Sequence, residues 1–227
     1  MTSIRVSTFA IALGGLLLAG EAHAQSAMMY SGRGYFGVSA GAIIPQDVHT
    51  TVSGADSASL DLSFKTGAAF TGFVGYHVNP QLALEAELGY ATADSDSVSG
   101  TINGVSGSVT VGGHLNPVLG FGNVLWKPLG YRGISPYLGA GVGFANIDSS
   151  VDSIAGTAVA GTSNNETDLA AQFIAGIDFP IGDRFSIGGR YRFVWVNSGA
   201  TATDGIDTVK QDDFTAHVLT VTGTFRF

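Results

Sequence analysis

The fold of this chain is decided by nine residues near its middle, Leu82-Ala83-Leu84-Glu85-Ala86-Glu87-Leu88-Gly89-Tyr90. Apolar side chains, most of them large, occupy every second position, and small or acidic side chains stand between them. Successive side chains of a β-strand point to opposite faces. The alternation therefore predicts a strand with one apolar face and one polar face.

Further stretches repeat this pattern or come close to it. Two alternate clearly, Phe185–Asn197 and Leu219–Phe227, and the remaining candidate strands are Tyr35–Ile43, Leu62–Val78, Val109–Trp126, Pro136–Ala145 and Leu169–Phe179. Together they give about eight strands, an even number, as single-chain bacterial barrels require. The stretch around Pro117 and Asn123 alternates poorly, which leaves its register open, because a proline inside a strand usually marks a bulge or an edge.

The composition indicates a surface that water does not cover everywhere. Only 12% of the 227 residues are charged, whereas a typical soluble domain has about 25%, and mean hydropathy is +0.29. Beyond residue 24 no apolar run approaches the roughly 20 residues of a membrane-spanning helix. Cysteine is absent, and the net charge of −8 argues against nucleic acid as a partner.

The start of the chain has the features of a secretory signal peptide. Arg5 precedes an apolar run over residues 9–19, and Ala22-His23-Ala24 follows it. Small residues at these positions favour cleavage after Ala24. We therefore expect a signal peptide over residues 1–24, a mobile segment over 25–34 and a barrel over 35–227.

The connections between the predicted strands alternate between short and long. Asn79-Pro80-Gln81, Gly182-Asp183-Arg184 and the stretch 127–135 are short. The long ones, predicted as loops rich in Ser, Thr, Gly and Asp, are 45–61, 94–108, 148–168 and 198–213. Outer-membrane barrels have short periplasmic turns and long external loops. The four long stretches hold thirteen acidic residues and one basic residue, Lys210, so the outer rim is predicted to be acidic.

Alternation alone does not say which face points inward, since a soluble barrel hides its apolar face and a membrane barrel exposes it. The polar face is also the face of small residues, which suit a crowded interior: Gly67, Ala69, Gly75, Ala83, Gly89, Gly139, Gly141, Gly143, Gly176 and Gly188. The aromatic face is therefore predicted to contact lipid. The fold class is all-β, an eight-stranded antiparallel up-and-down transmembrane β-barrel.

Four segments resemble the small outer-membrane β-barrels of the OmpA and opacity-protein type, porin-like surface antigens. They are Phe70-Thr71-Gly72-Phe73-Val74-Gly75-Tyr76, residues 84–90, Pro136-Tyr137-Leu138-Gly139-Ala140-Gly141-Val142-Gly143-Phe144 and Thr224-Phe225-Arg226-Phe227. The resemblance covers nearly all of residues 25–227. It implies that Phe225 and Phe227 form part of the signal that the barrel-assembly machinery reads.

A group of charged residues is predicted to point into the lumen. Its members are Lys65, Glu85, Glu87, Arg190, Arg192 and Arg226, with His77 and Asp178 as further candidates. Charges inside a narrow barrel are costly unless they are paired, so salt bridges across the lumen are expected. The interior of an eight-stranded barrel is just wide enough for side chains to fill, which favours a structural plug over a gated ion path.

The sequence offers little for catalysis. Small-barrel lipid A deacylases use a His and a Ser two positions apart, but Leu219 follows His217 and Asn116 follows His114 at that spacing. Rim proteases use Asp and His, for which only His49 with Asp47 or His217 with Asp213 are available. No nucleophile or activated water is suggested beside these pairs, and the acidic stretches lack the spacing of a calcium loop. We expect no catalytic, metal or cofactor site.

The expected function is that of a non-enzymatic scaffold in the bacterial outer membrane that presents external loops, as a surface antigen or adhesin does. A narrow porin-like channel for ions or small solutes is the alternative, and a lipid-modifying enzyme a distant one. The expected partners are outer-membrane lipid and lipopolysaccharide, the assembly machinery, and an extracellular or host ligand at the loops.

Overall fold

The computed structural model describes residues 33–53, 58–102, 105–154, 157–197, 201–204, 207–211 and 213–227. The expected signal peptide and its cleavage site at Ala24 lie outside these residues. So does the segment 25–34, apart from its last two residues. None of the described residues belongs to a helix long and apolar enough to cross a membrane.

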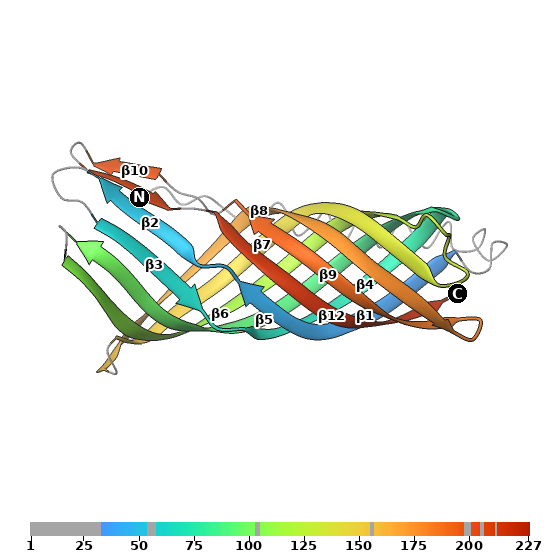
Figure 1. Cartoon of the computed structure of the whole chain (residues 1–227), viewed down its shortest axis with the longest axis horizontal. Helices are drawn as coiled ribbons and strands as arrows, with labels where there is room; N and C mark the ends of the chain where they lie inside the picture. The colour runs from blue at the N-terminus through green and yellow to red at the C-terminus, as the bar shows by residue number, and fades with distance from the viewer. Residues whose placement is uncertain are drawn as a thin grey trace.

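The described chain folds into strands that all pair antiparallel. They are β1 (Gly34–Pro45), β2 (Val48–Ser53), β3 (Ala58–Phe64), β4 (Gly67–Asn79), β5 (Leu82–Ile102), β6 (Val105–Trp126), β7 (Ser135–Ile154), β8 (Thr157–Ile181), β9 (Phe185–Val196), β10 (Thr201–Asp204), β11 (Asp207–Gln211) and β12 (Phe214–Arg226). Eight of them close a barrel in the order β1, β4, β5, β6, β7, β8, β9, β12, because β1 pairs with both β4 and β12 (Figure 1).

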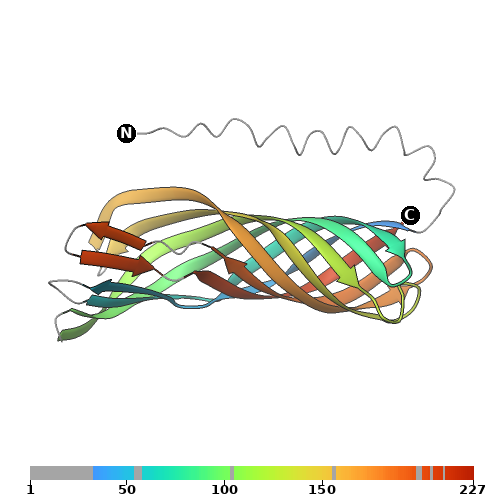
Figure 2. The ribbon, with the colours of Figure 1, turned by 90° about the horizontal axis from the view of Figure 1, so that it is seen from above.

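The predicted eight-stranded antiparallel barrel is thus confirmed. The second predicted strand, 62–78, is the one that differs, because it breaks at Lys65 and Thr66 into the end of β3 and the whole of β4. The three short connections lie together at the end of the barrel that also holds the C-terminus (Figure 2). Two of them use a glycine with positive φ, Gly130 at 77° and Gly182 at 78°, a conformation that side chains with a Cβ rarely adopt.

The predicted inside and outside faces are confirmed by exposure. On β5, Leu84 and Leu88 are 50% and 56% exposed, whereas Glu85 and Glu87 are each 4% exposed. The same alternation holds along β9 and β12. The apolar outer face is the one that a membrane barrel shows to lipid.

Glycines on the inner face make room for tyrosine rings. Tyr35 stands opposite Gly75 in the β1–β4 ladder, and Tyr137 stands opposite Gly176 in the β7–β8 ladder. A Cβ at either glycine would overlap the facing ring. The small inner residues therefore allow two large side chains to lie flat against the wall and fill the lumen.

Pro117 interrupts one ladder, and Asn123 keeps its register. The β5–β6 pairing runs to Tyr90 and Val118 and resumes at Ala93 and Leu115 without a shift. Pro117 lies in the gap, where its missing N–H costs the ladder a bond. The β6–β7 ladder continues past this point. Asn123 pairs with the inward-facing Glu85, so it also faces inward and is buried.

The four long connections differ from the prediction of loops. In the described residues β5, β6, β7 and β8 continue far beyond the barrel, and two further hairpins form, β2 with β3 and β10 with β11 (Figure 1). Backbone N–H and C=O groups pair whatever the side chains are, so strands persist where side-chain alternation no longer reveals them. The external part of the protein is therefore largely an extension of the wall.

Candidate functional site: the charged lumen

The centre of the lumen is built from residues two apart on two strands. Glu85 and Glu87 face inward from β5, and Arg190 and Arg192 face inward from β9. Three strands separate β5 from β9 around the barrel. All four charged side chains are at most 3% exposed, so their charges meet inside the protein and away from water.

Arg190 binds both glutamates. Its Nη1 lies 2.8 Å from Oε1 of Glu85, and its Nη2 lies 3.1 Å from Oε2 of the same carboxylate. Nη1 also donates to Oε2 of Glu87 at 3.2 Å. This two-pronged arrangement is the strong form of an arginine–carboxylate pair, and it fixes both partners in orientation.

Arg192 completes the pairing one step further along the barrel. Its Nε lies 3.3 Å from Oε1 of Glu87. Its Nη2 donates to the hydroxyl oxygens of Ser39, at 3.2 Å, and Thr71, at 2.9 Å. The two arginines thus neutralise the two carboxylates, and hydroxyls on β1 and β4 accept from Arg192 Nη2.

Neutral side chains surround this ionic cluster. Tyr35 donates to Glu85 at 3.2 Å, and Arg190 Nε donates to the Tyr137 hydroxyl at 3.0 Å. Asn123 donates to Glu85 at 3.4 Å and accepts from Gln172 at 2.8 Å. The cluster therefore ties together side chains from seven barrel strands.

A second polar layer lies toward the short-turn end. Lys127 Nζ is 2.8 Å from Asp178 Oδ2 and 4.7 Å from the centre of the Tyr137 ring. Tyr131, in the turn between β6 and β7, stacks on His77 with ring centres 4.0 Å apart. A cavity of about 20 Å³ remains there, enough for roughly one water molecule.

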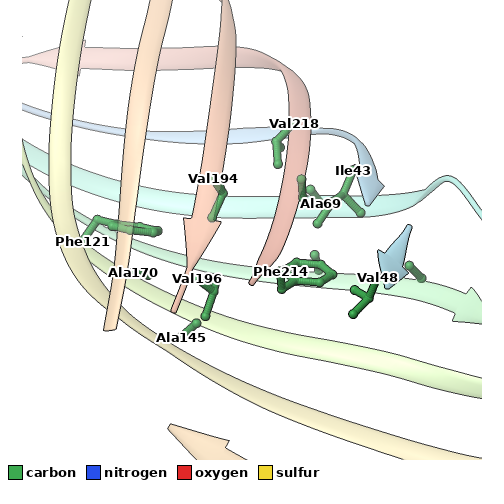
Figure 3. Packing of buried hydrophobic residues seen from close by; sticks show 13 residues of the cluster. Ile43, Val48, Ala69, Phe121, Ala145, Ala170, Val194, Val196, Phe214 and Val218 are labelled. Carbon is green, nitrogen blue, oxygen red and sulfur yellow. The ribbon is translucent and has the colours of Figure 1, made fainter. Parts of the chain in front are cut away.

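An apolar layer lies on the other side of the ionic cluster, toward the external hairpins. Val194 and Val196 follow Arg192 on β9, and they pack with side chains from the other barrel strands and from β2 (Figure 3). The cluster members are Ile43, Val48, Ala69, Ala91, Ala93, Phe121, Ala145, Ala170, Val194, Val196, Phe214, Ala216 and Val218. The lumen is therefore filled by three successive layers: polar, ionic and apolar.

The structure brings together four of the six residues assigned to the lumen cluster. Arg226 is buried inside the barrel, but at the short-turn end, where it donates to the carbonyl oxygen of Tyr131. Lys65 does not belong to the cluster: it is exposed and follows β3 at the strand break. Its N–H donates to the Asp94 carbonyl oxygen at 2.9 Å, which places it beyond the barrel proper.

The histidines considered for catalysis form other contacts. His49 pairs with Asp61 across the β2–β3 hairpin instead of with Asp47. The ring nitrogens of His217 lie 2.7 Å from the Tyr191 hydroxyl and 2.8 Å from Gln46 Nε2. Asp213 accepts a bond from the Trp195 indole at 3.0 Å. Among the described residues no cluster of three or more His, Asp or Glu side chains could hold a metal ion.

Residues 10–227 match the family model for the outer membrane protein β-barrel domain. The chain belongs to this family. It is therefore a bacterial outer-membrane protein, and the short-turn end of its barrel faces the periplasm. No curated protein matches the chain in sequence.

The chain is also similar to solved structures of outer-membrane proteins, and the first of those below agrees with the family on the fold. OprG from Pseudomonas aeruginosa is similar over 87% of this chain and 98% of its own, with a TM-score of 0.55 and 12% identity. Neisserial surface protein A is similar over 86% and 97%, with a TM-score of 0.47 and 16% identity. The outer-membrane protease OmpT from Escherichia coli is similar over 86% and 97%, with a TM-score of 0.49 and 5% identity.

Reasoning from sequence missed most of the neutral partners of the ionic cluster. Tyr35, Tyr137 and Gln172 were not proposed as lumen residues, and Lys127 was assigned to a turn. A signal was present, because each tyrosine begins an alternating strand on the face that carries glycine. Reading every inward position, rather than only the charged ones, would have found them.

Proposed function

We propose that this protein is a non-enzymatic envelope scaffold: a sealed barrel that anchors an extended β-structure at the outer surface of the bacterium. The observation that supports the sealed barrel is the three-layer filling of the lumen. The ionic cluster crosses the lumen between β5 and β9, and the apolar cluster lies directly outside it. An ion entering from outside would meet a dehydrated apolar layer before it reached any charge.

The extended hairpins support a role at the surface. Recognition commonly resides in connections held by a rigid scaffold, and here the connections stand on continued strands. Their sequences carry thirteen acidic residues against one basic residue. An extracellular or host ligand with a basic surface is the partner that this charge favours.

The barrel's further partners follow from its outer face and its last strand. Outer-membrane lipid and lipopolysaccharide would surround the exposed apolar side chains. The barrel-assembly machinery would read Phe225 and Phe227, which the structure places near Phe36, with ring centres 5.6 Å and 6.3 Å away, respectively.

A narrow channel is the second candidate, and the ionic cluster itself favours it. Both charged pairs depend on arginine side chains that reach inward from β9. Rotation of Arg190 away from Glu85 would leave a polar passage at this level. Ion passage would also require the apolar layer outside it to open.

Conductance separates the two functions. The refolded protein, reconstituted in planar bilayers, should show no discrete current steps across a range of salt concentrations and pH. A heat-denatured sample serves as the control for detergent artefacts. Reproducible single-channel openings of the folded protein would refute the sealed scaffold and support the channel.

A further inference from the structure

An apolar groove crosses the outer face of the barrel over its closing seam. It runs along one row of cross-strand partners, Ile187 on β9, Gly223 on β12, Val38 on β1, Gly72 on β4 and Leu88 on β5. These five strands lie side by side in Figure 1. The groove has a volume of about 760 Å³.

Missing side chains create the groove. Nothing lies within 4 Å of the position that a Cβ of Gly72 would take. Larger side chains rise on both sides of this floor, with Phe70 and Tyr90 on one side and Phe185 on the other. Phe70, Tyr90 and Phe185 are each about half exposed, so they form walls and leave the floor open.

The groove covers the height of one lipid leaflet. Its row begins near the periplasmic end, at the third residue of β9, and reaches the seventh residue of β5. Val118 on β6, the partner of Tyr90, also lines the groove. The six strands that line the groove are about 4.8 Å apart, which makes it roughly 24 Å long. Because the strands of a barrel are tilted by about 40°, a row across them rises by roughly 15 Å along the membrane normal. The hydrocarbon core is about 30 Å thick, so one leaflet contributes about the same height.

We propose that this groove binds the acyl chains of one anionic phospholipid from the periplasmic leaflet. The groove is continuous with the lipid-facing surface, so hydrocarbon is the medium that reaches it. Arg184 is exposed in the turn immediately before Phe185 and supplies a positive charge at the periplasmic end, where the phosphate lies. The opposite rim is acidic, which disfavours the phosphates of lipopolysaccharide.

A second copy of the chain fits the groove less well. Fifteen residues line it, whereas a stable interface uses about 20–30 residues on each side. In a two-fold dimer the same patch meets itself, so a groove would face a groove and its floor would stay empty. Flexible acyl chains fill such a space, and they would bridge β12 and β1 where the barrel closes.

Native mass spectrometry tests the proposal. The folded protein, exchanged into detergent after incubation with phosphatidylglycerol, should retain one lipid per barrel. Gly72→Phe, which fills the floor, should lower the retained fraction about tenfold, equivalent to roughly two lost methylene contacts. Arg184→Gln should lower it about threefold, as expected for an exposed ion pair. Gly122→Phe is the matched control, because Gly122 is exposed on the outer face of β6 and neither it nor its cross-strand partners Ala86 and Val142 line the groove.

Three outcomes would overturn the proposal. They are equal lipid retention by the Gly72→Phe and Gly122→Phe variants, preferential retention of lipopolysaccharide, and a protein dimer in place of a protein–lipid complex. Heat-dependent mobility on gels verifies that each variant is folded. Wild-type protein alone decides the matter if a variant fails to fold, since absence of retained phosphatidylglycerol also refutes the site.

Discussion

Arg190 on β9 reaches across the lumen and donates hydrogen bonds to both carboxylate oxygens of Glu85 on β5, at 2.8 and 3.1 Å. The two strands are not neighbours, and no backbone ladder connects them. The side chains of Arg190 and Glu85 are 3% and 0% exposed, respectively. The contact therefore braces opposite walls of the barrel.

Removing the arginine leaves Glu85 without its main partner and leaves Glu87 with Arg192 alone. We expect Arg190→Met to lower the free energy of unfolding by about 3–5 kcal/mol, the usual cost of breaking a buried pair from one side. Urea unfolding of the protein refolded in lipid vesicles measures this. Arg132→Met, at an exposed arginine in the turn between β6 and β7, is the control and should change little. Equal losses in both variants would contradict a bracing role for Arg190.

Neutralising both Glu85 and Arg190 tests which layer seals the lumen. The double variant Glu85→Gln/Arg190→Gln should be less stable than wild type but should stay silent in planar bilayers, because the apolar layer remains intact. Phe121→Ala added to this background removes one of the two buried phenylalanine rings of that layer. Current steps that appear already in the double variant would show that the ionic cluster alone closes the barrel.

Inner glycines are required where a tyrosine ring lies against the wall. Gly176→Val places its side chain against the Tyr137 ring and within 2.8 Å of the Gly189 carbonyl oxygen. A destabilisation of about 1–3 kcal/mol is expected, as for other overpacked interiors. Gly189→Val provides the comparison, because it adds the same side chain to the outer face. The prediction fails if chemical unfolding finds the two variants equally stable.

A charge on the outer face reports the position of the membrane. Leu88→Arg, at mid-height on the lipid side, should cost about 2–4 kcal/mol. Leu129 is also strongly exposed, at 73%, but it lies in the turn between β6 and β7. Leu129→Arg should therefore cost almost nothing in the same vesicle unfolding assay. A small effect at Leu88 would mean that this face is not in lipid.

The aromatic contacts at the closing seam should affect how fast the barrel forms. Phe227 is near Phe36 on β1, so its contact forms only when the last strand meets the first. We expect Phe227→Ala to slow refolding into vesicles, measured by the shift to the folded band on gels. Phe179→Ala removes an exposed ring from β8, away from the seam, and should have a smaller effect. Equal rates for the two variants would argue against a role of the seam.

The side-chain period predicted the faces of the barrel well, because strand geometry fixes it at two residues. Glu85 and Arg190 could be placed on the inner face from this period alone. Their pairing could not, since contacts across the lumen depend on the stagger between distant strands. Lys65 shows a second limit: its position follows the correct period, but the strand breaks beside it.

The side-chain period did not predict the external strands, for a different reason. Outside the membrane both faces of a strand contact water, so no alternation is selected, and stretches rich in Ser, Thr and Gly look like loops. The backbone ladder between β7 and β8 nevertheless continues from Ala145 and Asp168 to Ile154 and Thr157. Only the pairing reveals it.

The hairpin of β10 and β11 has one more consequence. Although it lies between β9 and β12 in the chain, β11 pairs with β2, which follows β1 (Figure 1). The first and last surface segments thus share one ladder across the seam. They form one continuous β-structure built from segments far apart in the chain, so a peptide grafted into either segment should alter the conformation of the other.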